Sequence, residues 1–110
     1  MKVSELIRTL DLEVITESDY SDKEVNGCYI GDLLSRVMGK AQEKNAWITI
    51  MNNINILAVA TLTEVSCIIL CENVAIDKDV LSKANEEEIV ILRSVKGAYE
   101  LAKEMGEILK

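Results

Sequence analysis

Two short runs of apolar residues in the second half of the chain constrain the fold most strongly. Residues 65–70 and 89–92 have the length of strands, and Ser66 is the single polar residue in them. A strand that is buried on both faces is apolar throughout, whereas a strand with one solvent-exposed face alternates apolar and polar residues. A helical pattern lies between the two runs, and others precede and follow them. This alternation predicts parallel strands joined by right-handed crossovers.

Two helix starts are predicted in this half, at Asp77 and Ser94. Short oxygen-bearing side chains accept hydrogen bonds from the free N–H groups of a first helical turn. The helix after Asp77 has an apolar stripe formed by Val80, Leu81 and Ala84. The helix after Ser94 has a longer stripe, formed by Ala98, Leu101, Ala102, Met105, Ile108 and Leu109.

The first half repeats the alternation with shorter elements. Apolar residues spaced i, i+3, i+4, i+7 predict a helix at Val3, Leu6, Ile7 and Leu10. Residues 12–16 and 28–30 are predicted strands, separated by a polar loop that closes on the turn Asn26-Gly27. Asp32 is the predicted N-cap of the next helix, whose expected buried stripe is Leu33, Leu34, Val37, Met38 and Ala41.

Residues 46–51 form another predicted strand, because they include three consecutive β-branched residues. Trp47 begins this strand, and we expect it to be half exposed and packed against a neighbour. The segment 52–64 fits either a helix or a long buried strand. The strand needs a turn before Ser66 and none is obvious, so a helix is favoured. The cap would come from Asn52-Asn53, and the stripe from Ile54, Leu57, Ala58 and Leu62.

The chain is predicted to be one α/β domain over residues 1–110, with a mainly parallel sheet and helices on both faces. It contains no proline, linker or repeat, and 49% hydrophobic with 28% charged residues is typical of a globular protein. No apolar run approaches the roughly 18 residues that span a bilayer. No signal-peptide segment follows Lys2, so we expect a cytoplasmic protein.

Charge and cysteine content narrow the possible partners. Twelve basic against nineteen acidic residues give a net charge of −7, which disfavours nucleic acid and anionic membrane surfaces. The three cysteines Cys28, Cys67 and Cys71 have no histidine to complete a metal site. We therefore expect them to be reduced, mostly buried small hydrophobes, and we expect no metal.

No catalytic residue is predicted. The sequence has no histidine, so it lacks the commonest general base and every Ser-His or Cys-His nucleophile. Neither a P-loop nor a G-x-G-x-x-G motif is present. The acidic run at residues 86–88 is typical of a solvated helix end. We expect a protein that is not an enzyme and that needs no cofactor.

One strand-to-helix junction is a candidate ligand site. In parallel sheets, ligands bind beyond the carboxyl ends of strands, where the N–H groups that begin a helix favour anions. The candidate ligand-binding residues here are Thr49, Met51, Asn52, Asn53 and Asn55. The competing interpretation is that Asn52 or Asn53 only caps the helix. At the matching junction after Leu70, Glu72 would repel an anion.

The run Gly-x-Tyr-Ile-Gly-Asp-Leu-Leu at residues 27–34 resembles the DRTGG domain family. The run Trp47-Ile48-Thr49-Ile50, residues 65–70 and residues 89–94 also fit this family. The resemblance covers roughly residues 3–109 and points to a free-standing version of the module. The family is similar to the N-terminal domain of HPr kinase/phosphorylase. It also occurs as an accessory domain in some phosphotransacetylases and in pyrophosphatases with CBS domains.

The resemblance implies an α/β fold, a tendency to dimerise and a regulatory role. In HPr kinase the chemistry belongs to a separate P-loop domain, which this chain lacks. Many relatives carry a Gly-Asp-Arg-like loop after the central strand, and the matching residues here are Met51, Asn52 and Asn53. If that loop binds a ligand in relatives, the site here is lost or changed in specificity.

Two function hypotheses follow. The first is a homodimeric regulatory or interaction module that acts on a partner enzyme or sensor protein. The second is a sensor that binds a small anionic metabolite or nucleotide near Asn52-Asn53. Donors that converge on a pocket would favour the sensor. Amides bonded to the backbone would favour the interaction module.

Overall fold

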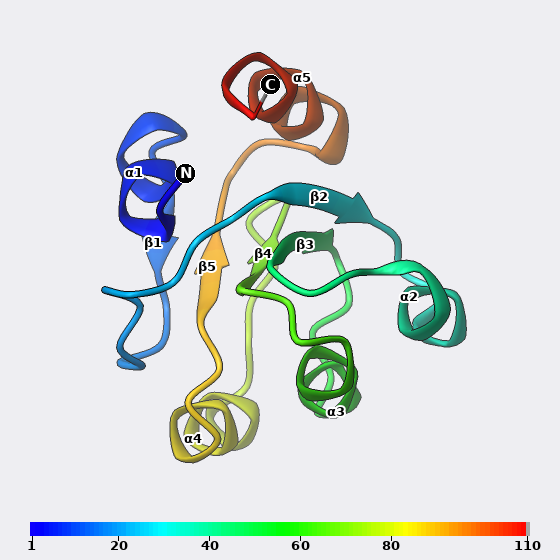
Figure 1. The fold of residues 1–110 in the computed structure, drawn as a ribbon. Coiled ribbons are helices and arrows are strands. Elements are labelled where there is room, and N and C mark those ends of the chain that lie inside the picture. Colours follow the sequence, from blue (N-terminus) through cyan, green and yellow to red (C-terminus); the bar gives the residue numbers. More distant parts are fainter. Residues whose placement is uncertain (110) are drawn as a thin grey trace.

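The computed structural model describes residues 1–109, which form a five-stranded sheet with helices on both faces (Figure 1). The predicted fold class is confirmed. The strands are β1 (Glu13–Val14), β2 (Gly27–Ile30), β3 (Asn45–Thr49), β4 (Cys67–Leu70) and β5 (Ile91–Arg93). The helices are α1 (Val3–Thr9), α2 (Leu34–Lys40), α3 (Asn55–Thr63), α4 (Lys78–Glu86) and α5 (Ala98–Ile108).

The strand order is β1-β5-β4-β3-β2. Strands β2 to β5 are parallel, and β1 pairs with β5 in the antiparallel sense. The two apolar runs become β4 and β5, which have a neighbour on each side, while β2 lies at an edge. Ile69 sits in register with Ile48 and Leu92. The uninterrupted apolar pattern is therefore explained by burial on both faces of the sheet.

Each face of the sheet has its own core. On one face, α1 and α5 pack over side chains that include Ile48, Ile69 and Leu92. On the other face, α2, α3 and α4 pack over side chains that include Trp47 and Ile68. Figure 1 shows these two groups of helices on opposite sides of the strands. Consecutive residues of a strand supply opposite cores, because strand side chains alternate between faces.

Helix caps differ from the sequence predictions. Helix α5 begins at Ala98 with Gly97 as its N-cap, so the predicted cap at Ser94 is wrong. The Ser94 hydroxyl instead accepts a hydrogen bond from the Lys96 N–H at 3.0 Å, within the loop after β5. Asp77 is the N-cap residue of α4, as predicted, but its side chain forms no capping hydrogen bond.

Several helix faces also differ from the predictions. On α3 the residues that face the sheet are Ile56, Leu57, Val59, Ala60 and Thr63, and only Leu57 belongs to the predicted stripe. Ile54, Ala58 and Leu62 are exposed. Six of the nine residues of α3 are apolar and they are spread around the helix, so periodicity does not identify its buried side. The predicted buried stripe near α2 is also partly wrong, because Leu33 and Met38 are exposed.

Trp47 is completely buried, which corrects the expectation of a half-exposed side chain. Its indole N–H donates to the Gly31 carbonyl oxygen at 2.9 Å. The expected role in packing is confirmed, because Trp47 belongs to the core beneath α2, α3 and α4.

The polar loop between β1 and β2 crosses the amino ends of the central strands. The Ser18 hydroxyl donates to the Ile89 carbonyl at 2.9 Å, and the Ser66 hydroxyl donates to the Glu24 carbonyl. The Lys23 carbonyl accepts from the Val3 N–H at 3.0 Å, at the start of α1. These bonds hold Lys23 over the amino end of β4. No helix within residues 1–109 combines the length and the hydropathy needed to cross a membrane.

Candidate functional site

The carboxyl ends of β2, β3 and β4 meet at one edge of the sheet, where the predicted site lies. Thr49 is the last residue of β3 and is 1% exposed. Its hydroxyl donates to Asp32 Oδ1 at 2.7 Å and accepts from the Met51 N–H at 3.1 Å. The Met51 side chain is half-buried and packs against the core beneath α3. Both residues are therefore built into the fold by these contacts.

Asp32 joins this edge from the end of β2 and does not cap a helix. The same Oδ1 atom that binds Thr49 also accepts from the Ile50 N–H at 3.0 Å. The N-cap position of α2 belongs to Leu33, so the predicted cap at Asp32 is wrong. Sequence reasoning assigned Asp32 a local role, whereas its partners lie 17 and 18 residues away. A carboxylate thus sits beside the predicted anion site.

The asparagine side chains of the loop after β3 are bonded to backbone groups. Asn52 Nδ2 donates to the Ala75 carbonyl at 2.6 Å. Asn53 Oδ1 accepts from the Asn55 N–H at 2.9 Å, at the first turn of α3. The side chains of Asn52, Asn53 and Asn55 are exposed. Amides that bond to the backbone, and do not converge on a pocket, favour the interaction module over the sensor.

The junction after β4 is closed by its own backbone. Glu72 and Asn73 have positive φ values of 58° and 55°. Their N–H groups donate to the carbonyls of Lys96 and Ser94, each at 2.8 Å, in the loop after β5. These two N–H groups are thus engaged within the protein, and the Glu72 carboxylate adds negative charge at the same edge.

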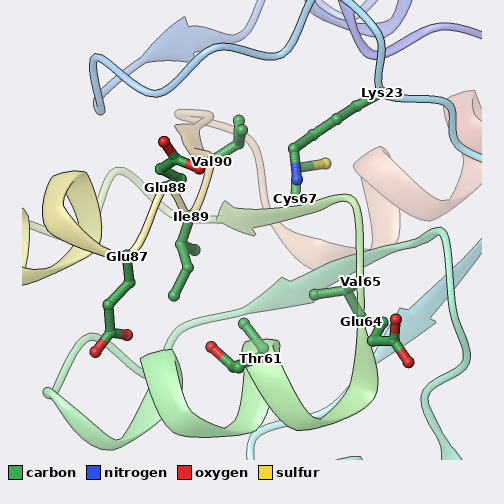
Figure 2. A pocket seen from close by; sticks show the side chains of 10 residues that line it. Lys23, Thr61, Glu64, Val65, Cys67, Glu87, Glu88, Ile89 and Val90 are labelled. Atoms are coloured by element: carbon green, nitrogen blue, oxygen red, sulfur yellow. The ribbon is translucent and has the colours of Figure 1, made fainter.

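The four described cavities lie elsewhere. None of the four described cavities is lined by Thr49, Met51, Asn52, Asn53 or Asn55. One cavity of about 310 Å³ lies at the opposite end of the sheet, where β4 begins (Figure 2). We call it the amino-end cavity; its polar and charged lining includes Lys23, Thr61, Glu64, Cys67, Glu87 and Glu88. These residues come from separate segments, and no sequence motif groups them.

The three thiols are protonated at neutral pH. Burial raises the pKa of Cys28 to about 11 and that of Cys67 to about 12. Burial also raises the pKa of Cys71, and the carboxylates of Glu72 and Asp32 add to the effect. Because the thiolate is the nucleophile, none of these thiols is activated.

Cys28 and Cys67 are also too far apart to pair. Cys28 and Cys67 flank Ala46 on two successive strand pairs, so they stand about 9–10 Å apart, beyond the roughly 7 Å limit for a disulfide. All three cysteines are free. Across residues 1–109, no group of three or more Cys, Asp or Glu side chains has the arrangement to hold a metal ion.

Comparison with known protein families identifies the family of this chain. The model of the DRTGG domain matches residues 5–108. The chain belongs to the DRTGG domain family. The resemblance seen in the run at residues 27–34 is thereby confirmed. No curated protein sequence matches this DRTGG domain.

A solved structure has the same fold. It contains the CBS and DRTGG domains of the regulatory region of Clostridium perfringens pyrophosphatase, complexed with its activator, diadenosine tetraphosphate. The two chains superpose with a TM-score of 0.70 at 12% sequence identity. The alignment covers 94% of this DRTGG domain chain and 45% of the pyrophosphatase chain. At this identity the likeness establishes the fold alone.

Proposed function

We propose that this DRTGG domain chain is a non-catalytic regulatory module that forms a homodimer and modulates a partner enzyme or sensor protein. Its family membership supports a regulatory role. The contacts at the carboxyl ends of β2 and β3 support a non-catalytic role. The side chains of Thr49, Asp32 and Asn52 are already hydrogen-bonded to other groups of the fold. The protonated thiols offer no nucleophile.

The open edge of the sheet carries the dimer proposal. Strand β2 is an edge strand, and an apolar groove of about 310 Å³ runs between it and α5. Ile30 is 44% exposed at the end of β2 and lines this groove, with Met105 and Leu109 of the α5 side. An exposed strand edge beside apolar side chains favours pairing with another chain. A two-fold dimer would use this surface in both copies.

The Ile30→Glu variant is expected to dissociate the dimer. In a two-fold interface each substitution appears twice, and like charges facing each other cost several kcal/mol. We expect the dissociation constant to rise by about a hundredfold or more. Analytical ultracentrifugation over a range of concentrations measures this change. Ile30 is exposed in the monomer, so the variant should keep its circular dichroism spectrum.

Val95→Glu is the matched control, because Val95 is 76% exposed in the loop after β5 and lines none of the described cavities. It should leave the dissociation constant unchanged. A wild-type chain that stays monomeric at every concentration would refute the dimer. Equal weakening by both variants would refute the β2 edge as its interface.

A second candidate function is a small-ligand sensor at Thr49, Met51, Asn52, Asn53 and Asn55. The observation that favours it is the nucleotide activator bound by the pyrophosphatase regulatory region. The Asp32 carboxylate beside Ile50 opposes an anion at this edge. A polyphosphate ligand would also compete with the bonds that Asn52 and Asn53 form to the backbone. The interaction module therefore stands first.

A thermal-shift titration with diadenosine tetraphosphate, ATP and AMP tests the sensor. A ligand at about 100 times its dissociation constant adds about 2.7 kcal/mol of stability. For a chain of this length, that is a rise in Tm of roughly 10 °C or more. If the site lies at this junction, the Asn52→Ala/Asn53→Ala double variant should abolish the rise. We expect no shift with the wild-type chain; a shift that the double variant abolishes would move the sensor to first place.

A further inference from the structure

The backbone of β2 turns two of its residues toward the outside of the sheet, where β2 is the last strand (Figure 1). In a parallel strand pair, successive residues point their N–H and C=O groups alternately toward the neighbouring strand and away from it. The Gly31 N–H donates to the Ile48 carbonyl of β3 at 3.2 Å. Counting back from Gly31 in steps of two, Tyr29 also faces β3, so Cys28 and Ile30 face outward.

The open part of this edge is limited on both sides. Just before β2, the Val25 N–H donates to the Met1 carbonyl at 2.7 Å. Just after β2, the Gly31 carbonyl accepts from the Trp47 indole N–H at 2.9 Å. An edge strand offers its outward N–H and C=O groups to another extended chain. Here that offer is confined to the two outward residues of β2.

The edge and the groove beside it are uncharged. None of the four residues of β2 is acidic or basic, and no charged residue lines the groove between β2 and α5. A two-fold axis places a residue close to its own copy, so a charged residue there would repel itself. In a chain with a net charge of −7, an uncharged edge of this kind suits a second copy of the same chain.

We propose that the β2 strands of two copies pair in the antiparallel sense, with Cys28 opposite Ile30 of the second copy and Tyr29 at the two-fold axis. This inference rests on the proposed homodimer and specifies how its two edges join. Residues that face each other in a hydrogen-bonded antiparallel pair exchange both of their bonds. In this register Cys28 and Ile30 of each copy therefore use every outward N–H and C=O group. The two five-stranded sheets become one continuous sheet.

Neighbouring registers use the outward groups less well. With Cys28 opposite its own copy, Ile30 would face Asn26, whose N–H already donates to the Lys44 carbonyl at 3.0 Å. With Ile30 opposite its own copy, Cys28 would face Asp32. That residue lies beyond the end of β2 and is fixed to the end of β3 by its side chain. Either shift leaves an outward group of β2 without a partner.

The side chains of β2 agree with this register. Ile30 is 44% exposed, and the Ile30 side chain of the second copy would lie beside Cys28, which lines the groove against α5. The groove is thereby filled by an apolar side chain. On the other face, the Tyr29 ring leans along the strand over Gly31, where an added Cβ would come within 3.0 Å of the ring. The ring thus leaves the two-fold axis clear for the close approach of the two backbones.

Amide hydrogen exchange of the wild-type chain, followed by NMR at increasing protein concentration, tests the pairing. Exchange at Cys28 and Ile30 should slow by about fivefold or more as the dimer forms, since both N–H groups gain a hydrogen bond. The Gly31 amide is bonded to Ile48 within each copy, so it is the internal control and should change little. A dimer that forms without slower exchange at Cys28 and Ile30 would overturn this pairing and leave the homodimer standing. A chain that stays monomeric, with both amides unprotected at every concentration, would overturn both and leave the edge to a strand of a different protein.

Disulfide trapping tests the register. The two Tyr29 Cα atoms should lie about 4.5 Å apart and the two Cys28 Cα atoms about 7–8 Å apart. A disulfide needs roughly 4.4–6.8 Å between Cα atoms. The oxidant is diamide, which takes up the electrons and protons released by a pair of thiols. It should cross-link the Cys28→Ser/Tyr29→Cys double variant and leave the wild-type chain uncross-linked.

The matched control is Cys28→Ser/Val95→Cys, because Val95 is 76% exposed in the loop after β5, away from the β2 edge. It should not cross-link under the same conditions. Circular dichroism and ultracentrifugation identify which variants are folded and dimeric. A wild-type chain that cross-links through Cys28 would overturn the register. So would a folded, dimeric Cys28→Ser/Tyr29→Cys chain that cross-links no faster than the control.

Discussion

Replacing Trp47 with alanine is expected to lower the free energy of unfolding by about 3–5 kcal/mol, the range for a buried tryptophan. The side chain is fully buried in the core beneath α2, α3 and α4. The substitution also removes the donor that satisfies the Gly31 carbonyl at 2.9 Å. A loss of this size is a large fraction of the stability of a small domain.

Urea unfolding followed by circular dichroism measures this effect, because Trp47 is the sole tryptophan and its fluorescence disappears in the variant. Trp47→Phe separates packing from hydrogen bonding, since it keeps most of the ring and loses the indole N–H. It should cost less than Trp47→Ala. Val95→Ala, at a 76% exposed position, should change stability by no more than about 0.5 kcal/mol. A Trp47→Ala loss close to that of Val95→Ala would contradict the packing described here.

The sequence predicts the sheet well because its central strands are specified by burial. Residues 65–70 and 89–92 are apolar on both sides, and only neighbours on both faces account for that pattern. They become β4 and β5, the paired strands near the middle of the sheet. The position of β1 in the sheet could not be predicted in this way. It is two residues long and is set by its pairing with Arg93 and Leu92 far along the chain.

The helix faces and caps were harder to predict, because the competing choices look alike in one dimension. Helix α3 is apolar on nearly all sides, so its docking on the sheet, and not its periodicity, buries Ile56 and exposes Leu62. Asp32 precedes a helix and has the chemistry of a cap. It bonds instead to Thr49 and Ile50, which its local sequence does not reveal.

The candidate ligand-binding residues remain a prediction. The sequence predicted a strand over residues 46–51, whereas β3 ends at Thr49, and it placed Asn55 in the first turn of a helix, where α3 begins. It could not show that Asn52 reaches the Ala75 carbonyl, a contact across 23 residues. The amino-end cavity was missed for the same reason. Its charged groups come from the loop before β2 and from the ends of α3 and α4, which meet only in the folded chain.

Removing the Asp32 carboxylate is expected to have the other large effect. Asp32→Ala should lower the free energy of unfolding by about 1–3 kcal/mol, because it leaves the Thr49 hydroxyl and the Ile50 N–H without their acceptor. Thr49 is 1% exposed, whereas Asp32 and its bond to the Ile50 N–H are exposed, so water can replace the acceptor at Ile50 and we expect most of the loss to come from Thr49. Asp32→Asn keeps an oxygen at the position of Oδ1 and should retain most of the stability. An Asp32→Ala chain as stable as the wild type would show that these bonds contribute nothing.

A double-mutant cycle assigns the effect to the pair. Thr49→Val keeps the shape of the side chain and removes its hydroxyl, which also serves the Met51 N–H. If Asp32 and Thr49 act together, the double variant should lose less stability than the two single variants combined, by about 0.5–3 kcal/mol. Ser94→Ala is the matched control, since its hydroxyl binds within the separate loop after β5. Additive losses for Asp32 and Thr49 would mean that the carboxylate stabilises this edge through Ile50 alone. A non-additive result would establish that the end of β2 is locked to the end of β3 by side chains. In that case, any ligand that binds there would first have to displace a carboxylate.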